Sequence, residues 1–303
     1  MKKVIIIITV VILVGLGLYY LINLSSEALQ SPDEYRADES EQKNATSTDQ
    51  VTEPTNGAKT IIGTSADGLD IVAYHFGRGE KEILFIGGIH GGYSWNSSLV
   101  AYNLIDHLSE NPPLALEAVK VTIIPVLNPD GLSKVVENEG PFEASDISLS
   151  LSETIPGRFN GNEVDLNRNF DCDWQSAATW QNKSVSGGNS AFSEPESAAL
   201  KNYVEANKPT AVISWDSAAG GVFASSCHNG VSAETLNLVN LYAEASGYKA
   251  YKDFDFYEIT GDMVNWLAKN DIPAIGVLLT SHNDAEWTKN LAGIEAVLEY
   301  YTD

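Results

Sequence analysis

Basic side chains are scarce in this sequence of 303 residues, with 18 lysines and arginines against 41 aspartates and glutamates. The formal net charge of -23 at pH 7 repels phosphate backbones, so nucleic acid is not expected as a partner. Cysteine is scarcer still, and Cys172 and Cys227 are the two that occur. They are too few for a disulfide framework and lack the paired spacing of a zinc ribbon. These observations leave two alternatives, one disulfide between the cysteines or two free thiols.

One long hydrophobic run stands near the N-terminus, at residues 4–24, and contains no charged residue. A run of about 20 apolar residues spans the hydrocarbon core of a membrane. Lys2 and Lys3 precede the run and acidic residues follow it, so the positive-inside bias places the C-terminal part outside the cytoplasm. An uncleaved anchor is favoured over a cleaved signal peptide, because no cleavage site of small residues follows the apolar run. We predict a single-pass protein of the cell membrane with an extracytoplasmic domain.

The composition changes after this anchor. Residues 25–58 are rich in serine, threonine and acidic residues and have almost no large apolar side chains. Such a segment cannot bury a core, so we predict an acidic flexible linker with no partner of its own. The folded domain is predicted at residues 59–303, long enough for one large core. In an extracytoplasmic domain, a disulfide between Cys172 and Cys227 is favoured over free thiols.

Strand and helix patterns alternate along residues 59–303. Buried strands are predicted at 83–89, 119–127, 211–215 and 274–279, and helices at 97–108, 194–207, 233–246, 262–269 and 290–300. A hairpin is expected at residues 60–63 and 69–76, around a turn at 66–68. Strand, helix and strand in succession predict parallel crossovers. The fold class is therefore α/β: three α/β/α layers with a central mixed, mostly parallel sheet, preceded by one transmembrane helix.

Polar residues follow three predicted strands, at residues 87–93, 213–216 and 278–282. Sites in such sheets lie beyond the carboxyl ends of strands, so these segments are expected to meet in one site. The segment 156–170 lies between them in sequence and carries Arg158 and Arg168. Two arginines in a short stretch suit a carboxylate ligand. His228 and His282 have no paired metal-ligand spacing, so a surface position is the simplest interpretation, although both could approach the site.

These segments resemble the zinc metallocarboxypeptidases, the carboxypeptidase A-like family, and especially its bacterial branch. The matching pieces are Gly-Gly-Ile-His-Gly-Gly at 87–92, Asn-Pro-Asp-Gly at 128–131, Val-Asp-Leu-Asn-Arg-Asn-Phe at 164–170, Phe-Ser-Glu-Pro-Glu at 192–196, and Tyr257, Gly261 and Trp266 at the family spacing. The resemblance covers about residues 59–303. It implies one zinc ion, held by two histidines and a glutamate, and a water that attacks the peptide carbonyl.

The sequence departs from the family at the metal centre. His90 matches the first zinc-binding histidine, but Ser94 stands at the glutamate position and Asp216 where the second histidine is expected. Leu278 stands at the position of the glutamate that acts as general base, and leucine cannot transfer a proton. His90 and Asp216 alone would hold zinc weakly. The resemblance therefore implies a degenerate metal site without hydrolysis.

The substrate-binding residues of the family are kept. Asn167 and Arg168 match the pair that binds a substrate's terminal carboxylate, and Tyr257 matches the tyrosine that closes over it. Arg158 matches the arginine that polarises the scissile carbonyl. Val264 aligns with the floor of the specificity pocket and offers no counter-charge to a basic side chain. An apolar or small terminal residue is therefore expected.

The leading functional prediction is a pseudopeptidase, a membrane-anchored module that binds peptide C-termini, such as those of cell-wall peptides, without hydrolysis. This prediction rests on two observations: the substrate-binding residues match the family, whereas the metal-binding and catalytic residues do not. A structural scaffold is a further alternative, in which the arginines are paired internally. Arg168 would then form an ion pair with Asp165 or Asp171.

An active zinc metallocarboxypeptidase is the other alternative. It would bind zinc through a rearranged site that includes His90 and Asp216, and Glu258 or Glu286 would act as the base. This alternative requires a third ligand at about 2.0–2.2 Å from the zinc. It also requires a carboxylate within hydrogen-bond reach of the zinc-bound water.

Overall fold

The computed structural model describes residues 55–137, 140–147 and 150–302 of the chain. The predicted anchor at residues 4–24 and the linker up to residue 54 lie outside the described residues. Within the described part, no helix has the length and apolar character needed to cross a membrane. The first strand begins at Thr55, so the folded domain starts slightly before the predicted residue 59.

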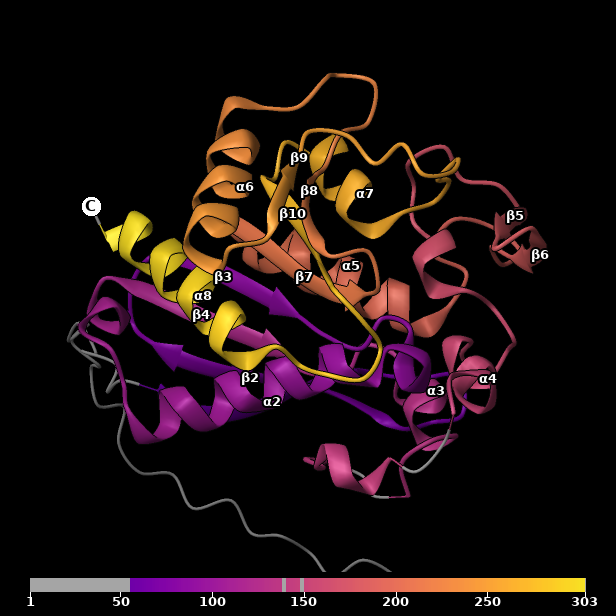
Figure 1. The fold of residues 1–303 in the computed structure, drawn as a ribbon, viewed down its shortest axis with the longest axis horizontal. Helices are drawn as coiled ribbons and strands as arrows, with labels where there is room; N and C mark the ends of the chain where they lie inside the picture. Colours follow the sequence, from indigo (N-terminus) through magenta and orange to yellow (C-terminus); the bar gives the residue numbers. More distant parts are fainter. Residues whose placement is uncertain (1–54, 138–139, 148–149, 303) are drawn as a thin grey trace, which may run out of the picture. The chain divides into compact units, whose positions relative to one another are not determined.

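A mixed sheet of eight strands forms the centre of this domain (Figure 1). Its order is β1-β2-β4-β3-β7-β10-β8-β9. The bounds are β1 (Thr55–Thr64), β2 (Asp70–Gly77), β3 (Lys81–Ile86), β4 (Val119–Ile124), β7 (Ala211–Ser217), β8 (Gly221–Ala224), β9 (Lys249–Tyr251) and β10 (Ala274–Leu279). Four of the seven pairings are parallel, including β4-β3, β3-β7 and β7-β10. The carboxyl ends of these central strands therefore meet at one edge.

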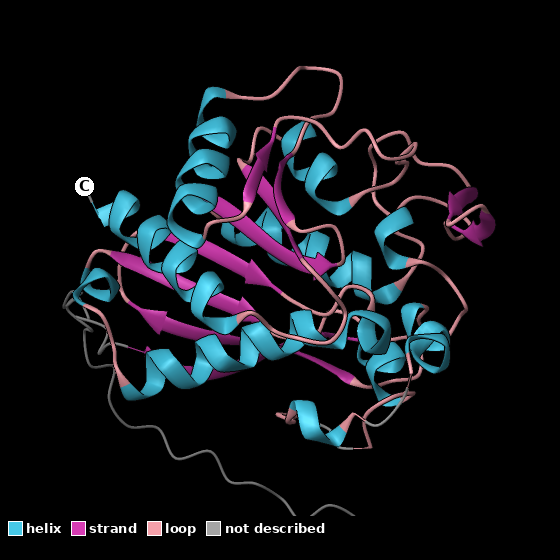
Figure 2. Ribbon diagram, viewed as in Figure 1, coloured by secondary structure: helices cyan, strands magenta, loops and turns pink. Residues whose placement is uncertain are grey.

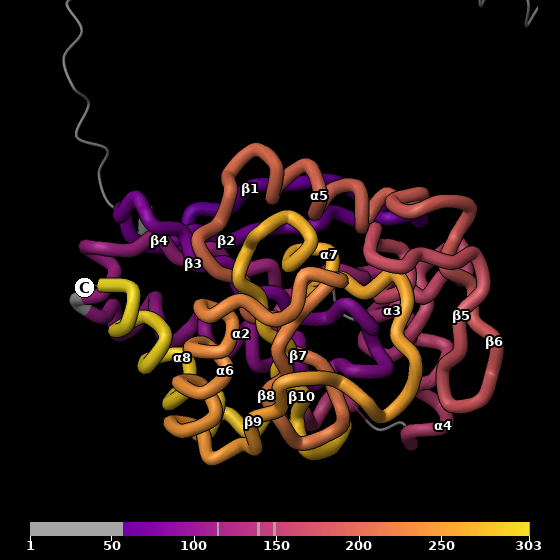
Figure 3. The backbone as a smooth tube through the Cα atoms, turned by 90° about the horizontal axis from the view of Figure 1, so that it is seen from above, coloured from indigo at the N-terminus to yellow at the C-terminus, as the bar shows by residue number. Residues whose placement is uncertain are grey.

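Helices cover both faces of the sheet (Figures 2 and 3). The longer ones are α2 (Trp95–Glu110), α5 (Pro195–Asn207), α6 (Ala233–Ser246), α7 (Met263–Lys269) and α8 (Trp287–Thr302). Ile83 and Phe85 of β3 belong to one core with α2, α6 and α8. Leu84 and Ile86 belong to a second core with α5 and α7, because neighbouring side chains on a strand point to opposite faces. The prediction of three α/β/α layers around a mixed sheet is confirmed.

The predicted elements are present, and their ends differ by a few residues. The bounds of α6 and β10 are as predicted. Helix α7 begins at Met263 because the Asp262 carboxylate accepts a hydrogen bond from the backbone N–H of Asn265, at 2.9 Å, as an N-cap. Strand β3 ends at Ile86 rather than at residue 89. The chain turns there through Gly88, whose φ of 63° suits glycine.

Several short elements have no counterpart in the prediction. They are β8 and β9, the hairpin of β5 (Ala177–Trp180) and β6 (Lys183–Ser186), α3 (Pro129–Ser133), α4 (Leu151–Thr154), and the 3₁₀ turns η1 (Gly91–Ser94), η2 (Leu114–Glu117), η3 (Ala144–Asp146), η4 (Ile155–Arg158) and η5 (Leu166–Arg168). Elements of three to five residues are too short to show a hydrophobic period. Three of them, η1, η4 and η5, carry residues of the site.

Candidate functional site

A pocket of about 200 Å³ lies beyond the carboxyl ends of β3, β7 and β10. The structure brings the following predicted site residues together in its lining: His90, Arg158, Asn167, Arg168, Asp216, Tyr257, Val264 and Leu278. Ser94 lies behind the lining and is fully buried. The three strand ends named from the sequence therefore do converge, as ligand sites in α/β sheets generally do.

The sheet register sets the order of side chains at the base of the pocket. His90 follows β3 and leads into η1, and Asp216 is the penultimate residue of β7. In the parallel pairing of β7 with β10, Leu278 is the register partner of Asp216. An apolar side chain therefore stands beside the carboxylate, at the position that the resemblance assigns to the catalytic glutamate.

Four charged residues form a continuous network on this side of the pocket. Arg158 donates from Nε and Nη2 to Oδ2 of Asp165, at 2.9 and 2.8 Å. The other Asp165 oxygen, Oδ1, lies 3.3 Å from His90 Nε2. His90 Nδ1 lies 2.8 Å from Asp216 Oδ2. Both ring nitrogens thus face carboxylate oxygens, which only accept, and this arrangement favours the imidazolium form of His90.

The network shifts the pKa values of its members. Burial and Arg158 lower the pKa of His90, but the carboxylates of Asp216 and Asp165 outweigh them, so its pKa lies above the ordinary value. Burial raises the pKa of Asp216, yet His90 brings it down to about 2. Asp165 is also held below its ordinary pKa, because Arg158 and His90 overcome the effect of burial. Two cations and two anions therefore balance each other without any further ion.

The residues at the metal position do not fit a catalytic zinc ion. They offer one imidazole nitrogen of His90, the carboxylate of Asp216 and the hydroxyl of Ser94, whereas such sites use three ligands among His, Asp, Glu and Cys. The Ser94 hydroxyl donates to the backbone carbonyl of Ser217 at 3.5 Å. Within the described ranges, the sole group of three such ligands is Cys172, Asp173 and Cys227. Its two sulfurs are joined to each other, so that group is not free to bind a metal.

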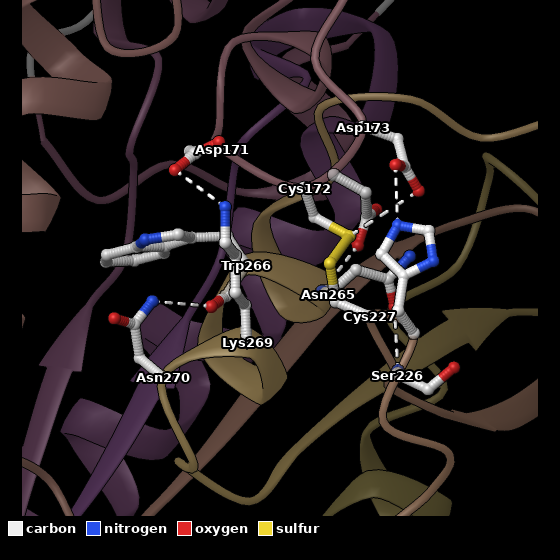
Figure 4. The surroundings of a disulfide bond; sticks show 11 residues. Asp171, Cys172, Asp173, Ser226, Cys227, Asn265, Trp266, Lys269 and Asn270 are labelled. Atoms are coloured by element: carbon white, nitrogen blue, oxygen red, sulfur yellow. Dashed lines mark hydrogen bonds and ion pairs between the residues drawn. A yellow bond between two sulfur atoms is a disulfide. The ribbon is translucent and has the colours of Figure 1, made fainter.

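The disulfide between Cys172 and Cys227 is the pairing favoured from the sequence, with Cα atoms 6.1 Å apart (Figure 4). It joins the segment after η5 to the loop after β8. The Cys172 carbonyl accepts a hydrogen bond from Gly261 N at 2.7 Å, and Phe170 N donates to the Gly261 carbonyl at 3.0 Å. In the same region, Ser226 N donates to the side chain of Asn265 at 3.0 Å. These contacts fix the segment that carries Arg168.

Arg168 also lines the pocket but forms no ion pair with this balanced network of charges. The side chain is 2% exposed, and its Nη1 donates to the backbone carbonyl of Asn167 at 2.8 Å. Its Nε and Nη2 are buried and have no hydrogen-bond partner among the described residues. Asp165 pairs with Arg158, and Asp171 pairs with Lys269 at 2.9 Å, so neither carboxylate is the partner of Arg168.

Tyr257 and Asn167 flank Arg168 in different ways. The Tyr257 ring lies 5.9 Å from the Arg168 guanidinium carbon and is 45% exposed, so it stands at the mouth of the pocket. Asn167 donates from Nδ2 to Asp262 at 2.9 Å and accepts from Met263 N at 3.0 Å. It therefore holds the start of α7, and its carbonyl oxygen is already engaged.

The two acids named as alternative bases do not line the pocket. Glu286 accepts hydrogen bonds from Thr280 N, Tyr248 and Lys289, at 2.6, 2.8 and 2.7 Å. Glu258 is exposed. Of the two histidines considered, His282 lines the pocket, and its Nδ1 lies 3.0 Å from the Tyr93 carbonyl.

Aromatic side chains form the remaining wall and were not predicted as site residues. The Phe254 ring lies 4.9 Å from that of Tyr257 and 5.3 Å from that of Phe223, all measured between centroids. On the opposite side, the Trp180 ring lies 4.5 Å from the guanidinium carbon of Arg158. The concentration of aromatics just before Tyr257 was the signal in the sequence that could have located this wall.

Comparison with known sequences agrees with this geometry. The family model described as zinc carboxypeptidase matches residues 43–274. Bacteriocin BCN5 of Clostridium perfringens is 29% identical over 160 residues, which are 51% of this chain and 16% of that protein. Carboxypeptidase B of Helicoverpa zea is 30% identical over 156 residues, which are 48% of this chain and 34% of that protein. The chain thus spans less than two thirds of the length of these relatives.

Solved structures share the fold. Bovine thrombin-activatable fibrinolysis inhibitor, in complex with tick carboxypeptidase inhibitor, matches with a TM-score of 0.63 at 18% identity, over 81% of this chain and 88% of that one. Murein-tripeptide amidase MpaA from Escherichia coli O157 matches with a TM-score of 0.54 at 18% identity, over 82% and 95%. Because the family model covers most of the sequence, the chain belongs to the zinc carboxypeptidase family.

Proposed function

We propose that this protein binds the C-terminal carboxylate of peptides in the pocket and does not hydrolyse them. The observation that carries the proposal is the Arg168 side chain, which is buried and leaves Nε and Nη2 without partners. Unpaired buried donors are rare in folded proteins and cost free energy. A ligand that satisfies both donors recovers that cost on binding.

A carboxylate suits these donors in shape and charge. Its two oxygens match neighbouring N–H groups of a guanidinium in a bidentate pair. The charges of Arg158, Asp165, His90 and Asp216 balance among themselves, whereas no ion pair to Arg168 is present among the described residues. The anion of the ligand therefore belongs with Arg168.

The walls of the pocket favour an apolar terminal residue. Val264, Leu278, Phe223 and Phe254 line it. The two carboxylates in the lining, Asp216 and Asp262, contact His90 and Asn167. Cell-wall peptides are our candidate source of such C-termini. The similarity in fold to a murein-tripeptide amidase supports this choice.

The absence of hydrolysis is proposed from the chemistry of the side chains. Leu278 cannot take a proton from water, and neither Glu258 nor Glu286 lines the pocket. The residues at the metal position, His90, Ser94 and Asp216, offer too few zinc ligands. These observations support a protein without hydrolysis over the active-enzyme alternative.

We also propose that the domain lies outside the cytoplasm, held to the cell membrane through residues 4–24. The apolar run and its flanking charges support the anchor. The Cys172–Cys227 disulfide supports an oxidising compartment, since disulfides persist mainly there.

The first test is calorimetric titration with a matched pair of N-acetylated dipeptides that end in phenylalanine, one as the free acid and one as the amide. We expect the free acid to bind at least roughly tenfold more tightly, because the amide removes the charge. Arg168→Gln should remove this preference, and Arg78→Gln, at an exposed position, should retain it. Equal affinity for acid and amide would contradict the proposal and leave the scaffold alternative.

The second test separates binding from catalysis. The purified protein is incubated with zinc, dialysed, and assayed for zinc content and for release of the terminal residue. We expect less than about 0.1 zinc per chain and no release. Stoichiometric zinc together with hydrolysis that is lost in His90→Ala would establish the active-enzyme alternative instead.

A further inference from the structure

The second residue in the pocket with an unmet polar atom is Asp216. Its Oδ2 contacts His90 Nδ1 at 2.8 Å, but its Oδ1 is buried and has no hydrogen-bond partner among the described residues. The Ser94 hydroxyl lies 3.5 Å from the Ser217 carbonyl and also acts as a donor that lowers the pKa of Asp216, so its one proton serves two acceptors. A buried carboxylate oxygen without a donor is as costly as a buried donor without an acceptor.

The two unmet groups are complementary and share one pocket. Arg168 presents two donors, and Asp216 presents an acceptor. Tyr257 lies within electrostatic reach of both, because the charges of Arg168 and Asp216 each affect its pKa, which burial raises. A ligand that carries only a carboxylate would leave the Asp216 oxygen unsatisfied.

The sign of the charge at Asp216 decides which ligand group faces it. A ligand carbonyl would put an acceptor against an acceptor, and like charges or dipoles disfavour binding. An ammonium group supplies three donors and the opposite charge. Its ion pair with a desolvated carboxylate is stronger than a neutral hydrogen bond.

We propose that the pocket selects small zwitterions, namely free amino acids or dipeptides with an apolar C-terminal side chain. The ligand carboxylate lies on Arg168 and the free ammonium on Asp216 Oδ1. The volume of about 200 Å³ fits this choice, since it is below the roughly 300–1,000 Å³ of pockets for larger ligands. This inference rests on the proposed carboxylate site and narrows its ligand class.

The test compares free and N-acetylated ligands by calorimetry, using phenylalanine with N-acetylphenylalanine and glycyl-phenylalanine with its N-acetyl form. We expect the free amine to bind at least roughly tenfold more tightly in at least one pair. Asp216→Asn should erase that preference, whereas Asp173→Asn, at an exposed position, should keep it. If Asp216→Asn does not fold, the ligand pairs on the unmodified protein still decide.

The outcomes separate this inference from the proposed function. If the acetylated ligands bind as tightly as the free amines in both pairs, and Arg168→Gln abolishes their binding, the zwitterion inference is wrong and the carboxylate site stands. If no member of either pair binds, both are wrong. If the free amine is preferred and the preference is lost in Asp216→Asn, the inference is supported.

Discussion

The pocket has two sets of charged residues, a paired side and an open side, which differ in how their charges are satisfied. On one side, Arg158, Asp165, His90 and Asp216 form a chain of ion pairs that consumes nearly every donor and acceptor. On the other, Arg168 keeps two buried donors unpaired. By resemblance, the first set stands where the family binds its metal and the second where it binds a carboxylate. The first set is paired internally, whereas the second keeps unmet donors.

This contrast teaches how to distinguish a relic from a working site. A relic that needs no ligand can neutralise its own charges, because burying an unpaired charge is costly. A binding site must leave some donors or acceptors unsatisfied until the ligand arrives. By that criterion Arg168 is the group to test for binding, and among the described residues the paired side retains one unpaired oxygen, Asp216 Oδ1.

The largest effect is expected from breaking the paired side at its centre. Asp165 is fully buried and joins Arg158 to His90. Asp165→Asn removes the anion between two cations, and we expect the free energy of unfolding to fall by about 3–5 kcal/mol. Urea denaturation measures the change. The exposed pair of Asp171 and Lys269 provides the control, because Asp171→Asn should cost about 1 kcal/mol or less. If both variants lose the same free energy of unfolding, the buried network stabilises the protein no more than an exposed ion pair does.

A smaller change in stability is expected from removing the disulfide that supports the segment of Arg168. Replacing both Cys172 and Cys227 by serine should lower the free energy of unfolding by about 2–4 kcal/mol. It should also weaken binding to Arg168, because the Cys172 carbonyl holds Gly261 beside the Arg168 segment. Denaturation and calorimetry on the double variant measure the two effects separately. Unchanged affinity in a destabilised variant would mean that the surrounding hydrogen bonds alone position Arg168.

The smallest change in stability is expected at Glu196, a buried acid that has no ion pair among the described residues. Glu196 accepts from Ala66 N and Asn160, and burial raises its pKa to about 7. Asp165 moves in the opposite direction because cations flank it. Since the folded pKa of Glu196 is raised, its favourable contribution is present below its unfolded pKa near 4.5 and is lost as pH rises through about 7.

Glu196→Gln removes this titration. The difference in the free energy of unfolding between the unmodified protein and the variant should therefore change by about 1–3 kcal/mol between pH 5 and 8. Denaturation at several pH values measures it, with the exposed Glu205→Gln as control. A difference that does not vary with pH would show that Glu196 is ionised throughout this range.

Much of the fold followed from local pattern. The buried runs that became β7 and β10 and the helical period of α6 were long enough to set both type and position. The meeting of His90 with Asp216 followed from the rule that parallel strands bring their carboxyl ends together. The short strands β8 and β9 lacked that length and were not predicted.

The choice of partner within the site did not follow from the sequence. Asn167 was assigned to the ligand by resemblance, yet its amide is engaged with Asp262 and Met263 across the pocket. Arg168 was given Asp165 or Asp171 as possible internal partners, and both pair elsewhere. The spacing of residues in the sequence predicts where the backbone segments lie. Which side chains form a hydrogen bond or ion pair depends on differences of a few tenths of an ångström in their distances.

The disulfide also changes what a cut in the chain would do. Cys172 and Cys227 are separated by 55 positions, and this enclosed stretch contains α5 and β7, including Asp216. A protease that cleaves once within the stretch produces two fragments that remain covalently linked. Arg168 lies before the stretch and Asp216 within it, so a single nick leaves both on one molecule. A domain exposed to extracellular proteases would thereby keep the two sides of its pocket connected after the first cleavage.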